Sequence, residues 1–342
     1  MCKFIANFFI LGYIFVVIHF TTVRITLDHL AVTCNLKCKH CYIDGRNKIL
    51  DKNSLIEVID LLYDKGVLLI VLTGGEIFSY PWFVEVYTYI KLKGFIVDLK
   101  TNALLLNDTI KTLLYKYPPH KIDISVYGLN NSDYGKFTGD YDGFSKLVNS
   151  LNWLYENEFS FQLTVMALQE TYKDLSAGNY NDFFSRYNCN LEFEYDIIPN
   201  FGTNKISDVG LLTPKQVVFL ERKSILYKEE IENAIPIKEN TNLICNGGVK
   251  SIFIDVDGFL HICIFDDKKF IINDLKNNQH LLYERNREII EMYKNSECSK
   301  CKNHIGCKRC PIRQKITLRS GTSSWRCELS MLRETLYYNN EF

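Results

Sequence analysis

The sequence has no excess of charge of either sign, no internal repeat and no tract of low complexity. Its 342 residues contain 40 Lys and Arg and 40 Asp and Glu, so the formal net charge is zero. This balance excludes the general basic surface that nucleic-acid binding needs, and it excludes an acidic tail. Apolar residues make up 47% of the chain. The composition therefore predicts a globular protein of two or three domains with a sizeable core and no nucleic-acid partner.

The first 21 residues lack a complete targeting signal. Residues 4–20 are almost continuously apolar and follow Lys3, but polar residues interrupt the run and no small-residue cleavage site precedes Thr21. Membrane spans begin near about 17 residues. Three interpretations stay open: a secretion signal, a helix that contacts the membrane, and an apolar leader. We favour the leader interpretation for residues 1–21.

Cysteine is unevenly distributed along the chain. Ten of the twelve Cys fall into an N-terminal and a C-terminal group. In an intracellular enzyme such tight spacing indicates metal or cluster sites, and in a secreted protein it would indicate disulfides. Cys34, Cys38 and Cys41 share one short stretch, and no fourth Cys follows until Cys189. Three thiolates would leave one iron of a cubane cluster without a protein ligand. The alternative is a zinc knuckle with His40 as the fourth ligand.

Strand-like and helix-like segments alternate from residue 22 onward. The predicted strands are residues 22–32, 68–73, 95–100, 122–126, 161–167 and 191–195. Strands linked by helices indicate an α/β fold with a parallel sheet and right-handed crossovers. Six units are too few for a closed eight-stranded barrel. We therefore expect a partial (β/α)6 barrel, similar to part of a TIM barrel, over residues 22–199.

Notable groups stand at the carboxyl ends of four predicted strands. The cysteine stretch follows the first strand, Gly74-Gly75-Glu76 follows the second, Asn102 follows the third, and Ser125 lies near the end of the fourth. The chemistry of such barrels gathers at this end of the strands. The glycine pair would let the backbone approach a ligand closely, and Glu76 offers a carboxylate to an amine. We expect these groups to form one site.

Two of these stretches resemble motifs of the radical S-adenosylmethionine (SAM) superfamily. Cys34-x3-Cys38-x2-Cys41, with His40 before the third Cys, is similar to its cluster-binding signature, and Gly74–Glu76 is similar to its methionine-amine motif. The resemblance implies a [4Fe-4S] cluster whose open iron is chelated by the amino and carboxylate groups of S-adenosylmethionine. It also implies reductive cleavage of this cofactor to methionine and a 5′-deoxyadenosyl radical, which abstracts a hydrogen atom from the substrate.

The resemblance implies a role for each matching residue. The implied cofactor-binding residues are His40, Gly74, Gly75, Glu76, Asn102 and Ser125. Gly74, Gly75 and Glu76 would hold the methionine end. Asn102 and Ser125 would contact the ribose and carboxylate, and His40 would pack near the adenine mainly through its backbone. Because open irons survive poorly in oxidising compartments, we expect a cytoplasmic protein.

The C-terminal cysteines resemble the SPASM domain that a subset of these enzymes carries. The seven residues are Cys245, Cys263, Cys298, Cys301, Cys307, Cys310 and Cys327. The resemblance implies one auxiliary [4Fe-4S] cluster on Cys298, Cys301, Cys307 and Cys327. It implies a second cluster on Cys245, Cys263 and Cys310, with a fourth position that is either open or filled by a residue such as Asp255, Asp257 or His261. Many SPASM domains have three residues between the fifth and sixth Cys, and this chain has two. A pair of zinc ribbons is the alternative.

The remaining segments complete the expected domain organisation. Residues 200–243 read as a connector, in which Thr213-Pro214 begins a helix that extends to about residue 232 and bridges the two cysteine domains. Residues 244–330 form the expected SPASM domain, and Asp257-Gly258 between alternating apolar runs predicts a β-hairpin within it. Residues 331–342 form a tail.

A local basic stretch runs along residues 294–319, with eight Lys or Arg and one acid. We expect its cations to offset the negative charge of thiolate-bound clusters and to dock an acidic electron donor of the flavodoxin or ferredoxin type.

The motifs favour an enzyme that modifies a peptide or protein side chain. Residues 125–144 resemble a stretch of SPASM enzymes that mature ribosomally made peptides, for example by a thioether or carbon–carbon crosslink. A sulfatase-maturating enzyme that forms formylglycine is one alternative, with Asp196 as its candidate acid or base. A cofactor-biosynthetic radical enzyme and a zinc-stabilised adaptor for peptide or nucleic acid also stay open.

Overall fold

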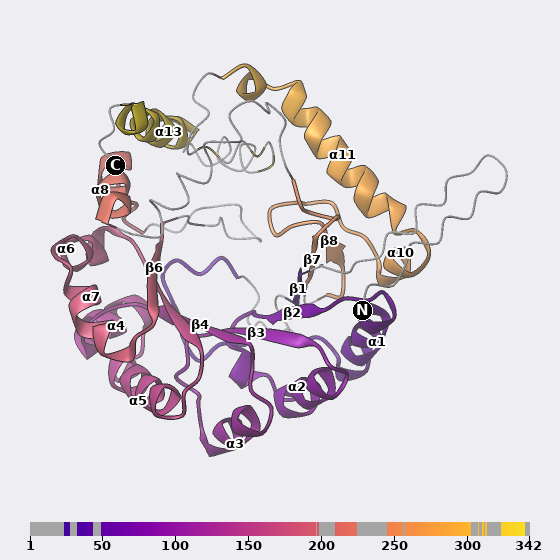
Figure 1. Ribbon diagram of the computed structural model, residues 1–342, viewed down its shortest axis with the longest axis horizontal. Helices are drawn as coiled ribbons and strands as arrows, with labels where there is room; N and C mark the ends of the chain where they lie inside the picture. The colour runs from indigo at the N-terminus through magenta and orange to yellow at the C-terminus, as the bar shows by residue number, and fades with distance from the viewer. Residues whose placement is uncertain are drawn as a thin grey trace, which may run out of the picture.

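One sheet of eight strands forms the centre of the molecule (Figure 1). The computed structural model describes residues 24–27, 33–43, 49–195, 197, 209–223, 245–255, 257–301, 307, 310, 312 and 323–338. The strands are β1 Arg24–Leu27, β2 Leu69–Leu72, β3 Ile96–Thr101, β4 Lys121–Val126, β5 Phe161–Met166, β6 Asn190–Glu194, β7 Ser251–Ile254 and β8 Leu260–His261. Their order in the sheet is β6-β5-β4-β3-β2-β1-β7-β8.

The first six strands form the predicted partial barrel. Neighbours from β1 to β6 pair in parallel and follow each other in chain order, which confirms the α/β fold and its six units. The helical segments are α1 Lys52–Asp64, η1 Ile77–Ser79, α2 Phe83–Leu92, α3 Asp108–Lys116, α4 Asn131–Thr138, α5 Gly143–Glu156, α6 Gln169–Ala177, α7 Asn179–Phe184 and η2 Ser185–Tyr187. The helices lie around the outside of the curved sheet (Figure 1).

The two faces of the sheet differ in polarity. In β4 the apolar Ile122, Ile124 and Val126 are buried and alternate with partly exposed polar residues. Successive side chains of a strand point to opposite faces, so the buried set packs against the helices. On the other face Lys100 of β3 pairs with Asp123 of β4 at 2.6 Å, and this carboxylate also accepts a hydrogen bond from Thr164 of β5 at 2.8 Å. The inner face of the barrel is therefore polar.

The C-terminal part of the chain contributes to the same sheet. The predicted hairpin around Asp257-Gly258 is confirmed, because β7 and β8 pair antiparallel on either side of this turn. The sequence did not predict that β7 also pairs in parallel with β1, residue Arg24 facing Ser251. Strand pairing between segments more than 200 residues apart leaves no local sequence signal. As a result the barrel and the C-terminal domain share one sheet.

The C-terminal helices lie on the open side of the barrel, where α10 lies near α1 and α8 lies near α6 (Figure 1). They are α8 Pro214–Lys223, α10 Ile272–Asn277, α11 His280–Lys294, η4 Glu297–Lys300 and α13 Ser323–Tyr338. Helix α8 begins where the sequence predicted, and the expected extension to residue 232 lies outside the described residues. None of the helices that the structure describes has the length and apolar character needed to cross a bilayer. The apolar leader at residues 4–20 lies outside the described residues.

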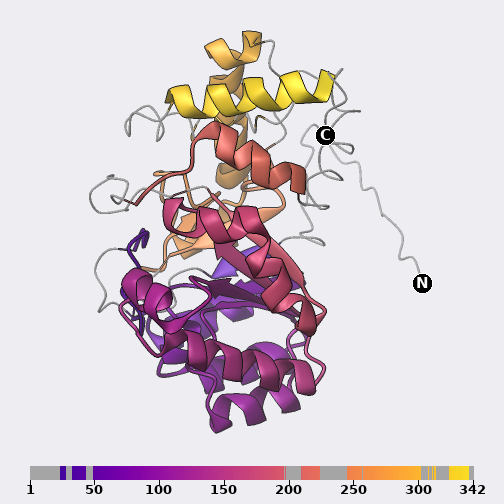
Figure 2. The same ribbon diagram turned by 90° about the vertical axis from the view of Figure 1, so that its left-hand side faces the viewer.

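Helix α13 contains most of the expected C-terminal tail. Residues 331–338 of that tail continue this helix. The helix lies across α8 (Figure 2). Its Arg333 forms a buried ion pair with Glu221 of α8 and donates a hydrogen bond to the hydroxyl of Tyr195 at 2.5 Å. Because an isolated helix gains little stability in water, this tertiary ion pair and the burial of Leu329 stabilise α13.

Candidate active site

The N-terminal cysteine loop, residues 33–43, is held by the end of helix α4. Lys37 N–H donates to the carbonyl of Thr138 at 2.8 Å, and Lys39 N–H donates to the carbonyl of Phe137 at 3.1 Å. The sequence did not predict α4, which lies within the stretch 125–144. The Asn130 side chain caps its first turn, and Gly139, with φ of 83°, ends it in the left-handed conformation that favours glycine. Helix α4 therefore supports the cysteine loop.

The three thiols of this loop are half-buried. Cys34, Cys38 and Cys41 have intermediate exposure. Leu36 N–H lies 3.4 Å from the sulfur of Cys34, and Cys41 N–H donates to the carbonyl of Cys38 at 3.1 Å. The backbone thus curls around its own sulfurs, as expected for a loop that wraps a cluster.

His40 lies in an aromatic cluster behind this loop. Its ring stacks on Phe137 with 5.1 Å between centroids and lies 5.6 Å from Tyr127. Burial lowers the pKa of His40 to about 4, so the imidazole is neutral at neutral pH. Its Nδ1 atom is buried and has no hydrogen-bond partner. The sequence predicted that His40 packs near the adenine mainly through its backbone, and it did not predict that the ring stacks on Phe137.

The loop after β2 is attached to the cysteine loop. Gly74 has φ of 146°, a conformation that side chains rarely adopt, which accounts for glycine at this position. Glu76 N–H donates to the carbonyl of Thr33 at 3.0 Å, and the Ser79 hydroxyl donates to the same carbonyl at 3.0 Å. The Gly-Gly-Glu stretch therefore directly contacts the residue that precedes Cys34.

The Glu76 carboxylate is fully buried and accepts three hydrogen bonds. Thr101 Oγ1 lies 2.5 Å and Phe78 N 3.1 Å from its Oε1, and Asn102 N lies 2.7 Å from its Oε2. Burial raises the pKa of Glu76, and the three donors oppose this rise. Oε2 accepts only one of these hydrogen bonds, so it has capacity for a further donor.

Asn102 joins the end of β3 to the cysteine loop. Its side-chain amide donates to Asn35 Oδ1 at 2.9 Å, and its Oδ1 accepts from Leu104 N–H at 3.0 Å. The next residue, Ala103, has φ of 61°, which is uncommon for a residue with a side chain. Its carbonyl is held by the Ser150 hydroxyl at 2.6 Å. Cys34, Glu76 and Asn102 thus lie in one connected network.

Ser125 lies on β4 beside the aromatic cluster. It is half-buried and lies two residues before Tyr127, whose ring contacts His40. The pKa of Tyr127 is raised first by burial and then by the negative charges of Cys38 and Cys34, which shows that these thiols are near. Tyr134 of α4 is also buried near both thiols, and its hydroxyl has no hydrogen-bond partner. The structure therefore brings Ser125 to the same site as the cysteine loop.

The donor set of this site fits an iron–sulfur cluster with a bound organic cofactor. Three thiolates are a ligand set for such a cluster. Two buried polar atoms beside them, His40 Nδ1 and the Tyr134 hydroxyl, have no partner in the protein and could be satisfied by a ligand. Within the described residues no group of three Cys, His, Asp or Glu side chains is arranged to hold a single metal ion. Ligands of a cubane bind different irons, so they need not converge on one point.

The C-terminal thiols fall into two groups. Burial raises the pKa of Cys263 to about 12, and the nearby charges of Cys310, Asp266 and Cys245 add to this rise. Burial also raises the pKa of Cys327, with smaller contributions from Cys307 and Cys301. Cys245, Cys263 and Cys310 therefore lie near each other, and so do Cys301, Cys307 and Cys327.

Asp255 and His261 were suggested above as a fourth ligand beside Cys245, Cys263 and Cys310. In the structure these two side chains contact each other and the nearby backbone. His261 Nε2 lies 3.0 Å from Asp255 Oδ2, and its Nδ1 lies 3.2 Å from the carbonyl of Asp266. Asp255 Oδ1 also accepts hydrogen bonds from the backbone of Asp257 and Phe259. Asp255 and His261 thus stabilise the β7–β8 hairpin. Asp196, the suggested acid or base, lies outside the described residues.

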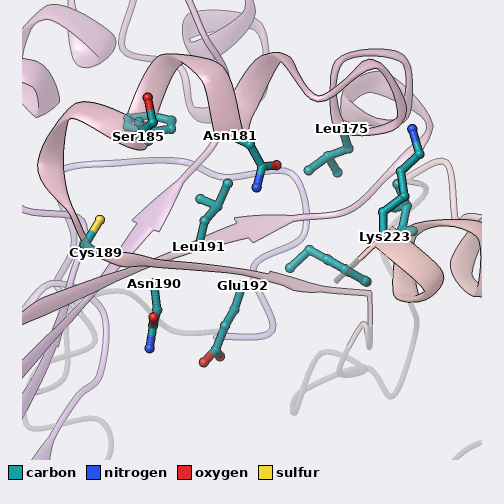
Figure 3. A pocket seen from close by; sticks show the side chains of 11 residues that line it. Leu175, Asn181, Ser185, Cys189, Asn190, Leu191, Glu192 and Lys223 are labelled. Carbon is teal, nitrogen blue, oxygen red and sulfur yellow. The ribbon is translucent and has the colours of Figure 1, made fainter. Parts of the chain in front are cut away.

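A pocket of about 440 Å³ lies beside β6 (Figure 3). It is lined by Leu175, Asn181, Phe184, Ser185, Cys189, Asn190, Leu191, Glu192, Phe193, Leu220 and Lys223. Burial raises the pKa of Cys189 to about 11, so this thiol is protonated at neutral pH. No residue that the sequence predicted for catalysis or cofactor binding lines the pocket, so it is not the candidate active site.

Comparison with known proteins identifies the protein superfamily to which this chain belongs. The family model "Radical SAM superfamily" matches residues 30–177. A probable GTP 3′,8-cyclase of Saccharolobus islandicus (strain M.14.25 / Kamchatka #1) is 30% identical over 282 residues, which cover 72% of this chain and 84% of that protein. The chain belongs to the radical SAM superfamily. This membership confirms the resemblance that the cysteine and glycine motifs carried, and it makes the protein an enzyme that uses S-adenosylmethionine and a [4Fe-4S] cluster.

A relative with a named biosynthetic role matches a longer stretch. The subtilosin biosynthesis protein AlbA of Bacillus subtilis (strain 168) is 26% identical over 296 residues. The match covers 82% of this chain but only 63% of AlbA, so the chain spans less than two thirds of that relative.

Two solved structures share the fold. Streptococcus suis SuiB bound to S-adenosylmethionine has a TM-score of 0.63 at 13% identity, over 82% of this chain and 71% of SuiB. The anSMEcpe structure with bound AdoMet has a TM-score of 0.66 at 16% identity, over 93% of this chain and 97% of that one. Coverage of 93% extends the likeness beyond the barrel into the C-terminal part.

Proposed function

We propose that this enzyme modifies a side chain of a ribosomally made peptide or of a protein, for example by forming a thioether or carbon–carbon crosslink. The observation that carries the proposal is the 296-residue similarity to a bacteriocin biosynthesis protein, which is too long to be confined to the barrel. The shared fold with SuiB, which has been solved with its precursor peptide SuiA, supports the same substrate class.

In this proposal Cys34, Cys38 and Cys41 hold the catalytic [4Fe-4S] cluster. S-adenosylmethionine held at this site would supply a 5′-deoxyadenosyl radical. Gly74 and Gly75 let the backbone approach the methionine end of the cofactor. Glu76 Oε2, which accepts one hydrogen bond in the protein, accepts a second one from the methionine amine. The donors of Thr101 and Asn102 fix this carboxylate before the cofactor binds.

The remaining cofactor contacts come from the strand ends and the aromatic cluster. Asn102 and Ser125 contact the ribose and carboxylate, and His40 lies near the adenine. Tyr127, Tyr134 and Phe137 surround the site with apolar surface and exclude water, which protects a reactive radical.

The C-terminal part is a SPASM domain with one or two auxiliary [4Fe-4S] clusters. The proposed ligands are Cys298, Cys301, Cys307 and Cys327 for one cluster and Cys245, Cys263 and Cys310 for the other. The proximity of the thiols within each group supports this division. The proposed domain boundaries are residues 22–199 for the barrel, 200–243 for the connector, 244–330 for the SPASM domain and 331–342 for the C-terminal tail.

We further propose that the enzyme acts in the cytoplasm and receives electrons from a flavodoxin or ferredoxin. Two described cations of the basic stretch, Lys294 and Lys300, are exposed on this domain, with nearby acids Glu291 and Glu297 at 3.4 and 4.0 Å. Exposed pairs of this kind are weak, so the cations stay available to an acidic partner. Membrane contact by residues 4–20 is a separate proposal.

Anaerobic reconstitution tests the cluster content. We expect about eight to twelve irons per chain and reductive cleavage of S-adenosylmethionine. The matched control is Cys189→Ala, which removes a thiol of neither group. This control should keep full iron content, whereas Cys34→Ala should lose the catalytic cluster. A protein that binds zinc and no iron would contradict the proposal.

A cofactor-biosynthetic function is the second candidate, because a probable GTP 3′,8-cyclase is 30% identical. Incubating the reduced enzyme with GTP and S-adenosylmethionine separates the two. Consumption of GTP favours the second function, and modification of a peptide favours the first. Activity on a sulfatase-derived peptide would instead favour the formylglycine-forming alternative.

A further inference from the structure

Helix α11 contacts two cysteine-bearing loops, the one that carries Cys245 and the one that follows Cys263. Its Asn286 is buried, and the side-chain amide donates to the carbonyls of Cys245 and Gly247, each at 2.8 Å. Both N–H groups of this amide are used by these two carbonyls, so Asn286 fixes the backbone of the loop that carries Cys245.

The adjacent residue of α11 holds the loop that follows Cys263. Arg285 donates to both oxygens of Asp266, from Nη2 at 2.7 Å and from Nε at 3.1 Å. Asp266 N–H in turn donates to the carbonyl of Cys263 at 3.1 Å. Glu288, one turn along the helix, accepts from Arg285 Nη1 at 2.8 Å and fixes the guanidinium. A bidentate pair of this kind is both strong and directional.

This arrangement is packed tightly. A Cβ atom on Gly247 would lie 2.7 Å from the carbonyl oxygen of Ile262, and one on Gly248 would lie 2.6 Å from the carbonyl oxygen of Leu282 in α11. Gly248 also has φ of 73°. Gly248 therefore lets α11 approach the loop that carries Cys245, and Gly247 lets the same loop approach the residue before Cys263.

This charge pair lies beside the loop that carries Cys263. The Asp266 side chain is fully buried, and its backbone N–H donates to the carbonyl of Cys263. Arg285 is 13% exposed and places its positive charge on the same carboxylate. Fixed charges and hydrogen bonds to the sulfurs are the means by which a protein sets the potential of an iron–sulfur cluster.

We propose that Arg285 and Asn286 form a clamp that positions Cys245 and Cys263 and sets the reduction potential of the cluster these residues hold with Cys310. This inference rests on the proposed auxiliary cluster and deepens it. Asn286 fixes the first cysteine loop directly, and Arg285 fixes the second through Asp266. Both are positioning residues, and neither ligates iron. Without Arg285 the buried charge of Asp266 is not compensated, which disfavours adding an electron nearby.

The test compares Arg285→Gln with Arg287→Gln. Both substitutions remove one positive charge from α11, but Arg287 is exposed and has no resolved contact with the thiols. We expect the midpoint potential of one auxiliary cluster, followed by electron paramagnetic resonance, to become more negative in Arg285→Gln and to stay at the wild-type value in Arg287→Gln. Arg285→Lys should restore part of the shift, because it restores the charge without the bidentate geometry.

A second variant tests the positioning by Asn286. Asn286→Ala should lose iron from one auxiliary site and leave the cluster that cleaves S-adenosylmethionine in place. Circular dichroism of each variant shows whether it has folded. If folded Arg285→Gln and Asn286→Ala match Arg287→Gln in potential and iron content, the clamp is wrong and the cluster assignment stands. If the wild-type protein binds only about four irons, the auxiliary-cluster proposal itself fails.

Discussion

Replacing Glu76 by Gln changes one oxygen at the centre of the network that joins β2, β3 and the cysteine loop. The carboxylate accepts hydrogen bonds from Thr101, Phe78 and Asn102, all inside the protein. The amide of Gln has only one acceptor atom. If the Gln oxygen takes the place of Oε1, where Thr101 and Phe78 donate, its NH2 group takes the place of Oε2. Two donors, this NH2 group and the N–H of Asn102, then face each other without an acceptor.

The cost of this substitution follows from those contacts. A hydrogen bond to a charged group contributes about 1.5 to 3 kcal/mol, and a buried donor left without an acceptor costs about 1 to 3 kcal/mol. Gln carries no charge, so the substitution also removes the cost of burying the carboxylate, and this gain offsets part of the loss. We therefore expect Glu76→Gln to lower the free energy of unfolding by about 2 kcal/mol. We also expect it to weaken S-adenosylmethionine binding by about tenfold or more.

The pH dependence has a definite sign. Because the folded-state pKa of Glu76 is raised above its ordinary value of 4.5, the folded state binds more protons than the unfolded state between these two values. The contribution of Glu76 to stability is present below the ordinary value and is lost as pH rises through the folded-state pKa. Glu76→Gln removes this titration, so its deficit in stability should shrink as pH rises.

Urea denaturation and equilibrium binding measure both effects. Glu57→Gln is the matched control, because Glu57 is exposed on α1 and should change neither quantity. Unchanged stability of Glu76→Gln would refute the idea that this carboxylate supports the network. Lower stability with unchanged cofactor affinity would instead refute only its role in binding the methionine amine.

Three further predictions concern the thiols, the aromatic cluster and the C-terminal helix. Cys34→Ala should abolish cleavage of S-adenosylmethionine and remove about four irons while the auxiliary iron stays, as measured by iron analysis and chromatography. Phe137→Ala should cost about 3 kcal/mol of stability, and by opening the cluster it should raise the pKa of His40 from about 4 toward 6.5, as measured by nuclear magnetic resonance. Arg333→Ala leaves Glu221 buried without its charge partner, so the free energy of unfolding should fall by about 3 to 5 kcal/mol.

The parts of the site that the sequence predicted are those with a local pattern. The spacing of Cys34, Cys38 and Cys41 and the Gly-Gly-Glu stretch each lie within a few residues of one loop. The six strands were predicted because each is a short apolar or alternating run between helical segments. Their order then followed from the preference of sequential units for neighbouring positions.

The parts that the sequence did not predict depend on contacts between distant segments. Helix α4 is short and contains Gly135, and its helical state depends on burying Tyr134 and on the carbonyls that accept from the cysteine loop. The hydrogen bond from Asn102 to Asn35 joins residues 67 positions apart. The pairing of β7 with β1 joins residues that are even farther apart in the sequence. No local pattern in either strand specifies its partner.

Peptide modification by this radical SAM enzyme is tested most directly with the peptide encoded by a short open reading frame beside its own. This peptide is incubated with the reconstituted, reduced enzyme and S-adenosylmethionine. We expect 5′-deoxyadenosine and a peptide that has lost two hydrogen atoms, and both should be absent with Cys34→Ala. Iron-loaded enzyme that cleaves S-adenosylmethionine but leaves every such peptide unchanged would contradict this expectation.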